Sequence, residues 1–298
     1  MRIVSLVPHA TELLFALGLG AQVVGVTHEC DFPDEALDLP QITRNVLDPG
    51  LTPGEIDAAV RARTAGGDSI YELDEELVRE LEPDLIVTQA LCHVCAVSVD
   101  EVRALAQALP GPPHVIALDP TTYGETLGDV RTIAQATGAK DRALDLIART
   151  ARRADVVRLA VRGAPRPRVA AIEWLDPVFV AGHWTPQLIE MAGGEDVLGF
   201  AGEPSREASW EELAAARPEV VVVMPCGYDA ARALVEAEEF ADRLAALGAD
   251  QVVAVDASSY FSRPGPRLVD GLELLAHILH PDRVPQTPAD PLAVQLEH

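Results

Sequence analysis

Short runs of apolar, mostly β-branched residues recur along the chain, separated by stretches with helical periodicity. The runs are RIVSL from residue 2, VVGVT from 23, DLIVT from 84, HVIAL from 114, RVAAIE from 168, VVVVM from 220 and VVAVD from 252. Because these runs are apolar throughout, they fit strands buried on both faces of a parallel sheet. Such strands in alternation with helices predict an α/β fold.

One helix-to-strand pattern occurs in each half of the chain. LDEELVRELEPDLIVTQ (73–89) and SWEELAAARPEVVVVMP (209–225) each contain a helix-capping residue, Asp74 or Ser209, followed by acidic residues, an apolar stripe, a proline and a buried run. This internal repeat predicts two lobes of the same α/β type.

The length of 298 residues also suits two domains. Residues 121–163 have helical periodicity, and 140–162 contain no Gly or Pro, which predicts one helix of about 23 residues and roughly 35 Å. We therefore expect an N-terminal lobe over 1–120, a helical linker over 121–164 and a C-terminal lobe over 165–283. Residues 284–298 read as a loose, Pro-rich tail whose final LEH resembles an expression-tag scar.

The charge balance limits the classes of partner. A formal net charge of -24, from 47 acidic and 23 basic residues, argues against nucleic acid and anionic membranes, which require clustered Lys and Arg.

No apolar run approaches the roughly 18 residues that span a bilayer, so we expect no membrane insertion. Pro8, His9 and Glu12 interrupt the apolar N-terminus, which fits a strand and a helix better than a signal peptide. These features predict a cytoplasmic monomer.

Chemically distinctive side chains follow the predicted strands. In open parallel sheets, ligands bind beyond the carboxyl ends of the strands, so these side chains are candidates for one binding face. They are His28, Glu29 and Cys30 after the second run; Gln89, Cys92, His93 and Cys95 after the third; Trp174, His183 and Trp184 after the fifth; Cys226 and Tyr228 after the sixth; and Tyr260, Phe261 and Arg263 after the seventh.

The four cysteines admit several interpretations. Cys92 and Cys95 form a C-x-x-C pair, which suits a redox pair, half of a zinc site or a part of an iron-sulfur cluster. His28, His93, Cys30 and Cys226 are candidates for the remaining ligands, provided that Cys226 of one lobe meets the cysteines of the other. Small buried core residues are the plain alternative.

Catalytic motifs are absent from the sequence. It contains no G-x-S-x-G, no H-E-x-x-H and no P-loop. Glu173 and Asp176 flank Trp174, but carboxylates in such positions more often orient ligand groups or cap helices. The sequence therefore favours a binding protein over an enzyme.

Several stretches in order resemble the helical-backbone class (class III) of substrate-binding proteins of ABC importers, the vitamin B12 and iron-chelate type. They are RIVSLVPHATELLFALGLG, VVGVTHECDFP, PDLIV, DPVFVAGHWTPQLIEMAGGEDVLG and SSYFSRPGPRLVDGLELLAHIL, and the cysteine-bearing stretches are similar to a cobalamin-binding subgroup. The resemblance implies two Rossmann-like lobes joined by one long helix, a ligand held in the cleft between them, and an ABC permease as partner. Relatives of this class are periplasmic or extracellular, whereas no export signal is recognisable here.

The resemblance also implies roles for particular residues. In the B12 binders, cleft aromatics cover the corrin ring, which implies that Trp174, Tyr260 and Phe261 line the cleft with Trp184 nearby. Pro8, His9 and Thr11 lie at a helix N-terminus that offers backbone N–H groups to a ligand amide or carboxylate.

The implied ligand is a cobalamin-like corrinoid or a related metal chelate, such as haem, with a His or Cys as a candidate ligand to its metal. The alternative function is a cytoplasmic metalloprotein with a Cys/His-ligated zinc or iron-sulfur site. The resemblance further implies that one exposed acidic residue on each lobe docks on the permease. Glu75, Glu76, Glu211 and Glu212 are candidates, although their position at helix N-termini explains them equally well.

Overall fold

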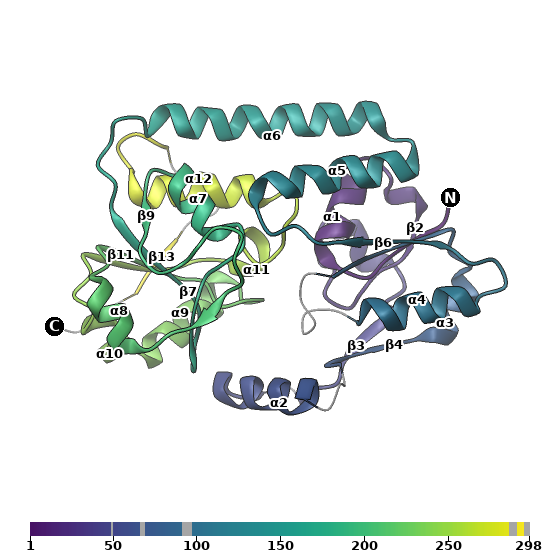
Figure 1. The fold of residues 1–298 in the computed structure, drawn as a ribbon, viewed down its shortest axis with the longest axis horizontal. Helices are drawn as coiled ribbons and strands as arrows, with labels where there is room; N and C mark the ends of the chain where they lie inside the picture. The colour runs from purple at the N-terminus through teal and green to yellow at the C-terminus, as the bar shows by residue number, and fades with distance from the viewer. Residues whose placement is uncertain (49, 66–68, 91–96, 286–290, 295–298) are drawn as a thin grey trace. The chain divides into compact units, whose positions relative to one another are not determined.

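The computed structural model describes residues 1–48, 50–65, 69–90, 97–285 and 291–294 (Figure 1). The chain divides into two compact units: unit 1 consists of residues 1–120 and 125–147, and unit 2 of residues 121–124 and 148–298. Each unit contains its own sheet with a parallel core, which confirms the α/β class. The finer boundaries at residues 120, 164 and 283 stay predictions.

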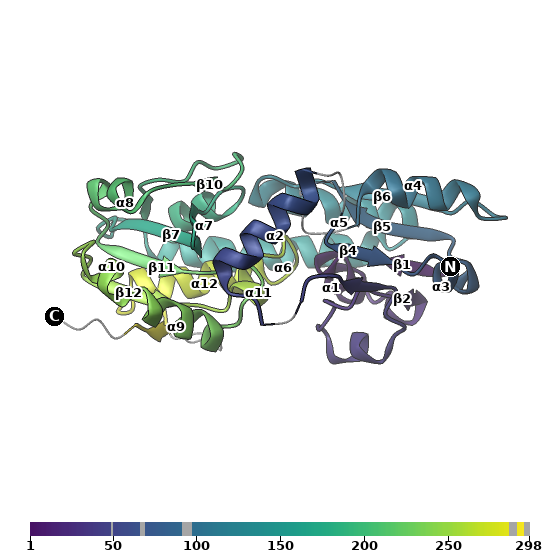
Figure 2. The same cartoon turned by 90° about the horizontal axis from the view of Figure 1, so that it is seen from below.

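Unit 1 is built on a four-stranded sheet. Its elements are β1 (Ile3–Ser5), α1 (Pro8–Ala16), η1 (Gly20–Gln22), β2 (Val23–Gly25), η2 (Asp34–Asp38), β3 (Thr43–Asn45), α2 (Pro53–Ala65), β4 (Tyr71–Leu73), α3 (Glu75–Leu81), β5 (Leu85–Gln89), α4 (Val99–Ala108), β6 (His114–Leu118) and most of α5 (Tyr123–Thr137). The sheet order is β2-β1-β5-β6 with all neighbours parallel, as Figure 2 shows. The first four apolar runs therefore form one sheet.

Both faces of this sheet are buried, as the unbroken apolar runs predicted. Ile3 and Val87 pack in a cluster with side chains of α1 and α5, whereas Val4 and Ile86 pack in a second cluster with side chains of α3 and α4. Figure 1 shows α1 and α5 on one side of the strands and α3 and α4 on the other. Adjacent residues of one strand thus face opposite helical layers.

Unit 2 is built on a larger mixed sheet. Its elements are β7 (Arg168–Leu175), β8 (Val178–Val180), α7 (Thr185–Met191), β9 (Glu195–Asp196), β10 (Arg206–Glu207), α8 (Trp210–Ala216), β11 (Val220–Val223), α9 (Ala230–Glu239), α10 (Ala241–Ala245), β12 (Gln251–Ala254), α11 (Ala257–Tyr260), α12 (Leu268–Leu279) and β13 (Leu292–Ala293). The sheet order is β10-β8-β7-β11-β12-β13, with β9 also paired to β7. In Figure 1, α7 and α12 lie on one side of the parallel core β7-β11-β12, and α8 to α10 on the other.

The internal repeat is present in both units at the level of single hydrogen bonds. Asp74 Oδ1 accepts a hydrogen bond from Leu77 N at 2.9 Å, and Ser209 Oγ accepts one from Glu212 N at 3.1 Å. Each capped helix, α3 or α8, has seven residues and ends at a residue with a left-handed backbone, which is Glu82 in α3 and Arg217 in α8. A proline and a parallel strand follow in both cases, which confirms the predicted pattern.

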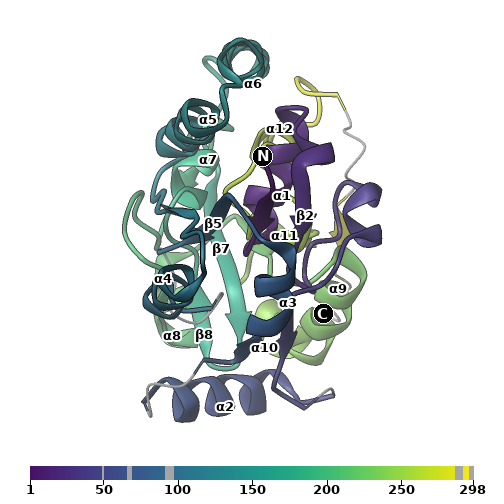
Figure 3. The same ribbon diagram turned by 90° about the vertical axis from the view of Figure 1, so that its right-hand side faces the viewer.

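The predicted long helix is α6 (Lys140–Ala160), which is seen end-on in Figure 3. It has 21 residues and stops two residues before the predicted end, because Gly163 (φ 72°) and Pro165 follow. Its first residues belong to unit 1 and its later ones to unit 2. Arg153 of α6 donates hydrogen bonds to Glu273 and Asp270 of α12 at 2.5 to 2.8 Å. Across the described part of the chain, no helix combines the length and the apolar character needed to cross a membrane.

Antiparallel additions are the part of the fold that the apolar runs did not predict. The antiparallel strand pair β3-β4 forms in unit 1, with α2 between its two strands in the chain, and β8 and β10 extend the sheet of unit 2. Leu292 and Ala293, in the stretch expected to be loose, pair with β12, and Val294 beside them is buried. The apolar runs did not predict these strands because each has only two or three residues, which is too few for a periodicity to be recognised.

Candidate functional site

The strand order of unit 1 reverses between β1 and β5. The chain moves from β1 to β2 in one direction and from β5 to β6 in the other. Such a reversal opens a crevice at the carboxyl ends of the two central strands. Pro8 and His9 follow β1, with His9 buried, and Gln89 is the buried last residue of β5. The structure therefore brings three of the predicted residues to one edge of the sheet.

Thr11 and Cys30 lie together inside unit 1. Thr11 Oγ1 is 2.8 Å from Ser5 Oγ and 3.0 Å from Cys30 Sγ, and Thr27 Oγ1 is 3.2 Å from the same sulfur. Thr11 has no exposed surface, and Cys30 belongs to the apolar core around α1. These side chains hold the loop after β2 against α1, and any ligand role for them stays a prediction.

His28 and Glu29 are hydrogen-bonded to the antiparallel strand pair β3-β4. His28 Nδ1 lies 2.7 Å from Thr43 Oγ1, and the Tyr71 hydroxyl donates a hydrogen bond to Glu29 Oε1 at 2.7 Å. The rings of His28 and Tyr71 are 5.3 Å apart. Thr43 and Tyr71 were not among the predicted residues, because their contacts with residues 28 and 29 depend on the pairing of β3 with β4.

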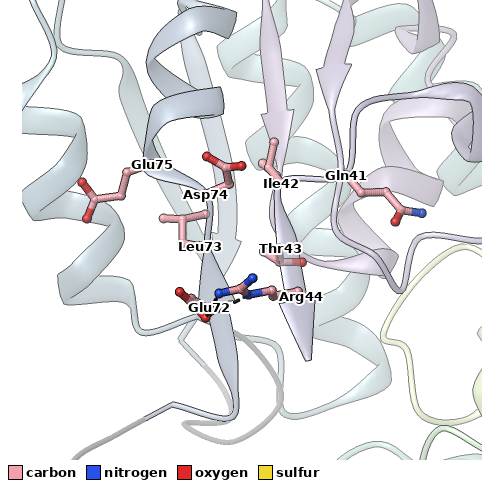
Figure 4. Close-up of a pocket in the computed structure, with 8 residues that line it drawn as sticks. All are labelled: Gln41, Ile42, Thr43, Arg44, Glu72, Leu73, Asp74 and Glu75. Carbon is pink, nitrogen blue, oxygen red and sulfur yellow. Dashed lines mark hydrogen bonds and ion pairs between the residues drawn. The ribbon is translucent and has the colours of Figure 1, made fainter. Parts of the chain in front are cut away.

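The same strand pair borders a polar pocket of about 470 Å³. Figure 4 shows its lining, in which Arg44 Nη2 pairs with Glu72 Oε2 at 2.6 Å. The lining residues are Gln41, Ile42, Thr43, Arg44, Glu72, Leu73, Asp74 and Glu75. Of the predicted binding or docking residues only Glu75 is among them, and the lining residue Thr43 contacts His28.

In unit 2 the loops after the three parallel strands are tied to each other. Cys226 N donates to the carbonyl of Glu173 at 3.1 Å, Ser258 N donates to the carbonyl of Tyr228 at 3.0 Å, and Gly227 N donates to Ser262 Oγ at 3.2 Å. These bonds connect the end of β7 and the loops after β11 and β12 into one edge, where several predicted residues meet.

Aromatic side chains dominate this edge. Trp174 and Tyr228 pack edge to face with their ring centroids 5.5 Å apart. Trp184 Nε1 donates a hydrogen bond to the carbonyl of Phe261 at 2.8 Å, and both side chains are buried. Trp174 and Tyr260 are half-buried, so each keeps part of its ring accessible.

Arginines lie against two of these rings. The Arg232 guanidinium is 3.6 Å from the centroid of Tyr228, and that of Arg267 is 5.9 Å from the centroid of Tyr260. Arg263 Nη2 donates to Ser258 Oγ at 3.3 Å. Burial raises the pKa of both tyrosines, so their hydroxyls stay protonated at neutral pH.

His183 has a left-handed backbone, with φ of 53°. Its N–H donates to the carbonyl of Glu203 at 2.6 Å. The preceding Gly182 is required by packing, because a Cβ there would lie 2.4 Å from Ser205 N. The strained turn fixes the direction from which His183 and Trp184 leave β8.

Unpredicted members of the unit 2 edge are Arg232 and Glu236. Glu236 is buried although it carries a carboxyl group. A signal for it exists in the sequence, because positions 233, 236 and 237 lie on one face of α9 and Glu236 is the only charged residue among them. A charged residue on an apolar stripe marks an unusual environment.

The described residues offer no cluster of side chains for a resident metal. No group of three or more His, Cys, Asp or Glu side chains that could hold a metal ion occurs among the described residues. Cys30 is buried in unit 1 and Cys226 is exposed in unit 2. Cys92, His93 and Cys95 lie outside the described residues, so the C-x-x-C interpretation stays a prediction.

Comparison with known proteins places the chain among binding proteins of one type. The family model described as "Periplasmic binding protein" matches residues 3–259. A vitamin B12-binding protein of Vibrio cholerae is 22% identical over 288 residues, which cover 91% of this chain and 86% of that protein. An uncharacterised ABC transporter substrate-binding lipoprotein of Bacillus subtilis is 24% identical, with 94% and 80% covered. The crystal structure of a periplasmic haem-binding protein from Pseudomonas aeruginosa shares the fold, with a TM-score of 0.71, 21% identity, and 100% and 99% of the two chains covered.

These matches correct the cytoplasmic location inferred from the N-terminus. The family is one of periplasmic proteins, and a solved structure that covers the whole chain is also of a periplasmic protein. The inference was wrong because the apolar N-terminal stretch of this sequence is the first strand and helix of the fold, and a folded strand carries no information about the compartment.

Proposed function

Because this chain belongs to the periplasmic binding protein family, we propose that it captures a cobalamin-like corrinoid and delivers it to an ABC permease. Its relatives are binding proteins and not enzymes, and the chain is likewise a binding protein of the ABC import type. The vitamin B12-binding relative supports the corrinoid, and the lipoprotein relative supports the transporter partner.

The aromatic edge of unit 2 is the observation that carries the proposal. A flat macrocycle requires aromatic faces with accessible surface, and Trp174 and Tyr260 retain such surface. We propose that these two rings contact the ligand, while buried Trp184 and Phe261 hold them in place from behind. His183 and Arg263 are further contacts on the same edge.

Unit 1 supplies a second set of proposed contacts. Pro8, His9 and Gln89 lie at the strand reversal between β1 and β5. Backbone N–H groups at the start of α1 suit the amide oxygens that surround a corrin ring.

Charge favours a corrinoid over haem. Apart from the one that carries the nucleotide phosphate, the side chains of the corrin ring end in neutral amides, whereas haem carries two carboxylates that a chain of net charge -24 repels. Arg263 and Arg267 of the unit 2 edge would suit carboxylates, so haem is the ligand against which the proposal is compared.

Titration with cyanocobalamin, dicyanocobinamide and haemin tests the proposal through tryptophan quenching and visible spectra. We expect the two corrinoids to bind, and the variant Trp174→Leu to bind about tenfold more weakly because it lacks the aromatic face. Trp210→Leu is the matched control, since Trp210 lies in α8 and stacks on Phe240. Saturation by haemin alone would reassign the ligand, and unchanged signals with all three compounds would overturn the proposal.

A further inference from the structure

A carboxylic acid lies beneath the aromatic edge of unit 2. Glu236 of α9 is 5% exposed, and Tyr228, which precedes the same helix, is also 5% exposed. Tyr228 contacts Trp174 on one side, and Arg232 covers its ring at 3.6 Å. A chain of direct neighbours thus runs from Glu236 through Tyr228 to the accessible ring of Trp174.

Glu236 and Tyr228 interact, but their buried oxygens lack regular hydrogen bonds. Each group shifts the pKa of the other, yet neither Tyr228 Oη nor Glu236 Oε1 forms a hydrogen bond of regular geometry within the described structure. A buried polar atom without a hydrogen bond destabilises the folded state, and ionisation of the carboxyl changes this contribution to the free energy.

From this geometry we propose that Glu236 is a positioning residue, whose protonation state sets the placement of Tyr228 and, through it, the ligand-contacting ring of Trp174. Its relevance to ligand capture rests on the proposed function, whereas the control of Trp174 does not.

The charged groups that face Glu236 explain how it would act. When ionised, Glu236 would attract the Arg232 guanidinium and the Tyr228 hydroxyl, and this attraction would hold the tyrosine ring between its two neighbours. Asp176, in the turn between β7 and β8, and Glu239 of α9 oppose the charge. Burial is the largest cause and raises the pKa of Glu236 to about 7, which puts the change of state near neutral pH.

Tryptophan fluorescence against pH tests the positioning without any ligand. We expect the emission of the wild-type protein to change in one step with a midpoint near pH 7, and the step to vanish in Glu236→Gln, whose amide stays neutral, and in Trp174→Phe. Glu238→Gln is the matched control on the exposed side of α9 and should keep the step. A step that persists unchanged in Glu236→Gln overturns the proposal.

Tyr228→Phe provides a second variant in case the buried amide prevents folding. The Tyr228 hydroxyl lowers the pKa of Glu236, so its removal should move the midpoint of the step upward. An unmoved midpoint would contradict the contact between the two residues.

The affinity for cyanocobalamin at two pH values tests whether the positioning by Glu236 affects ligand binding. We expect about threefold tighter binding at pH 8 than at pH 6 in the wild type, because ionised Glu236 fixes Tyr228, and equal affinity at both pH values in Glu236→Gln. Equal wild-type affinities at the two pH values would overturn the link to capture. Failure of all binding would instead count against the proposed function and leave the fluorescence test to decide the positioning.

Discussion

Asp129 of α5 resembles Glu236 in holding a proton up to neutral pH. Burial is the main cause, and the neighbouring Asp119 and Glu125 add to it, so the pKa of Asp129 is raised from 3.8 to about 7. One carboxyl oxygen, Oδ2, is buried without a hydrogen bond in the described structure. We expect the charge of Asp129 to act on the stability of the protein.

Asp129→Asn should therefore make the protein less sensitive to rising pH. The native state keeps the proton to about pH 7, whereas the unfolded chain releases it near pH 4, so the native state binds more protons between these values. The free energy of unfolding of the wild type consequently falls as pH rises through this window. Relative to the variant, we expect the wild type to lose about 1–2 kcal/mol between pH 5 and pH 8, a figure reduced for partial solvent screening.

Denaturant unfolding at both pH values measures this difference. Asp141→Asn, at an exposed position in the first turn of α6, is the control and should follow the wild type. Parallel pH profiles of the wild type and Asp129→Asn would contradict the expected native protonation.

At the scale of elements, the repeated unit α3-β5 and α8-β11 is stabilised in the same way in both units. Arg2 N donates to Asp84 Oδ2 at 2.7 Å, and Arg168 N donates to Glu219 Oε2 at 2.7 Å. The side chains of the same arginines reach the carbonyls of Leu81 and Ala216 at 2.7 Å, where each helix ends. An arginine at the start of a strand therefore caps the neighbouring helix in each unit.

The N-terminal caps of these helices should contribute equally. Asp74→Ala and Ser209→Ala each remove one side-chain acceptor for a first-turn N–H group, and we expect each to lower the free energy of unfolding by about 1 kcal/mol. Glu80→Ala, on the exposed face of α3, should change it by less than about 0.5 kcal/mol. If the two cap variants lower the free energy of unfolding no more than Glu80→Ala does, packing alone stabilises the repeated unit.

At the scale of the whole molecule, the net charge of -24 is the dominant property. Two copies repel each other at low ionic strength, since the Debye length is then about 30 Å. We expect light scattering in about 10 mM salt to give the mass of one chain, 31.8 kDa, with and without ligand. A mass of twice this value that persists at low salt would contradict the expected monomer.

The sequence by itself determined the parts of this protein that depend on local pattern. Seven apolar runs specified seven parallel strands, β1, β2, β5, β6, β7, β11 and β12, because strands buried on both faces must be apolar throughout. The absence of Gly and Pro specified α6, and the motif Asp74 or Ser209 to proline specified the repeated unit. The sequence also predicted that Trp174, Tyr228 and Phe261 lie at one edge of the sheet, because the carboxyl ends of parallel strands share an edge.

Tertiary structure alone decided which side chains meet and which are enclosed. Thr11 and Cys30 became neighbours inside unit 1 because the loop after β2 packs on α1, a contact that no spacing reveals. Tyr71 reached Glu29 across 42 positions, and the short strands β3, β8 and β13 formed because pairing partners were available. Burial of Glu236 under Tyr228 likewise depends on the packing of α9, since solvent exclusion is a property of the assembled unit and not of the local chain.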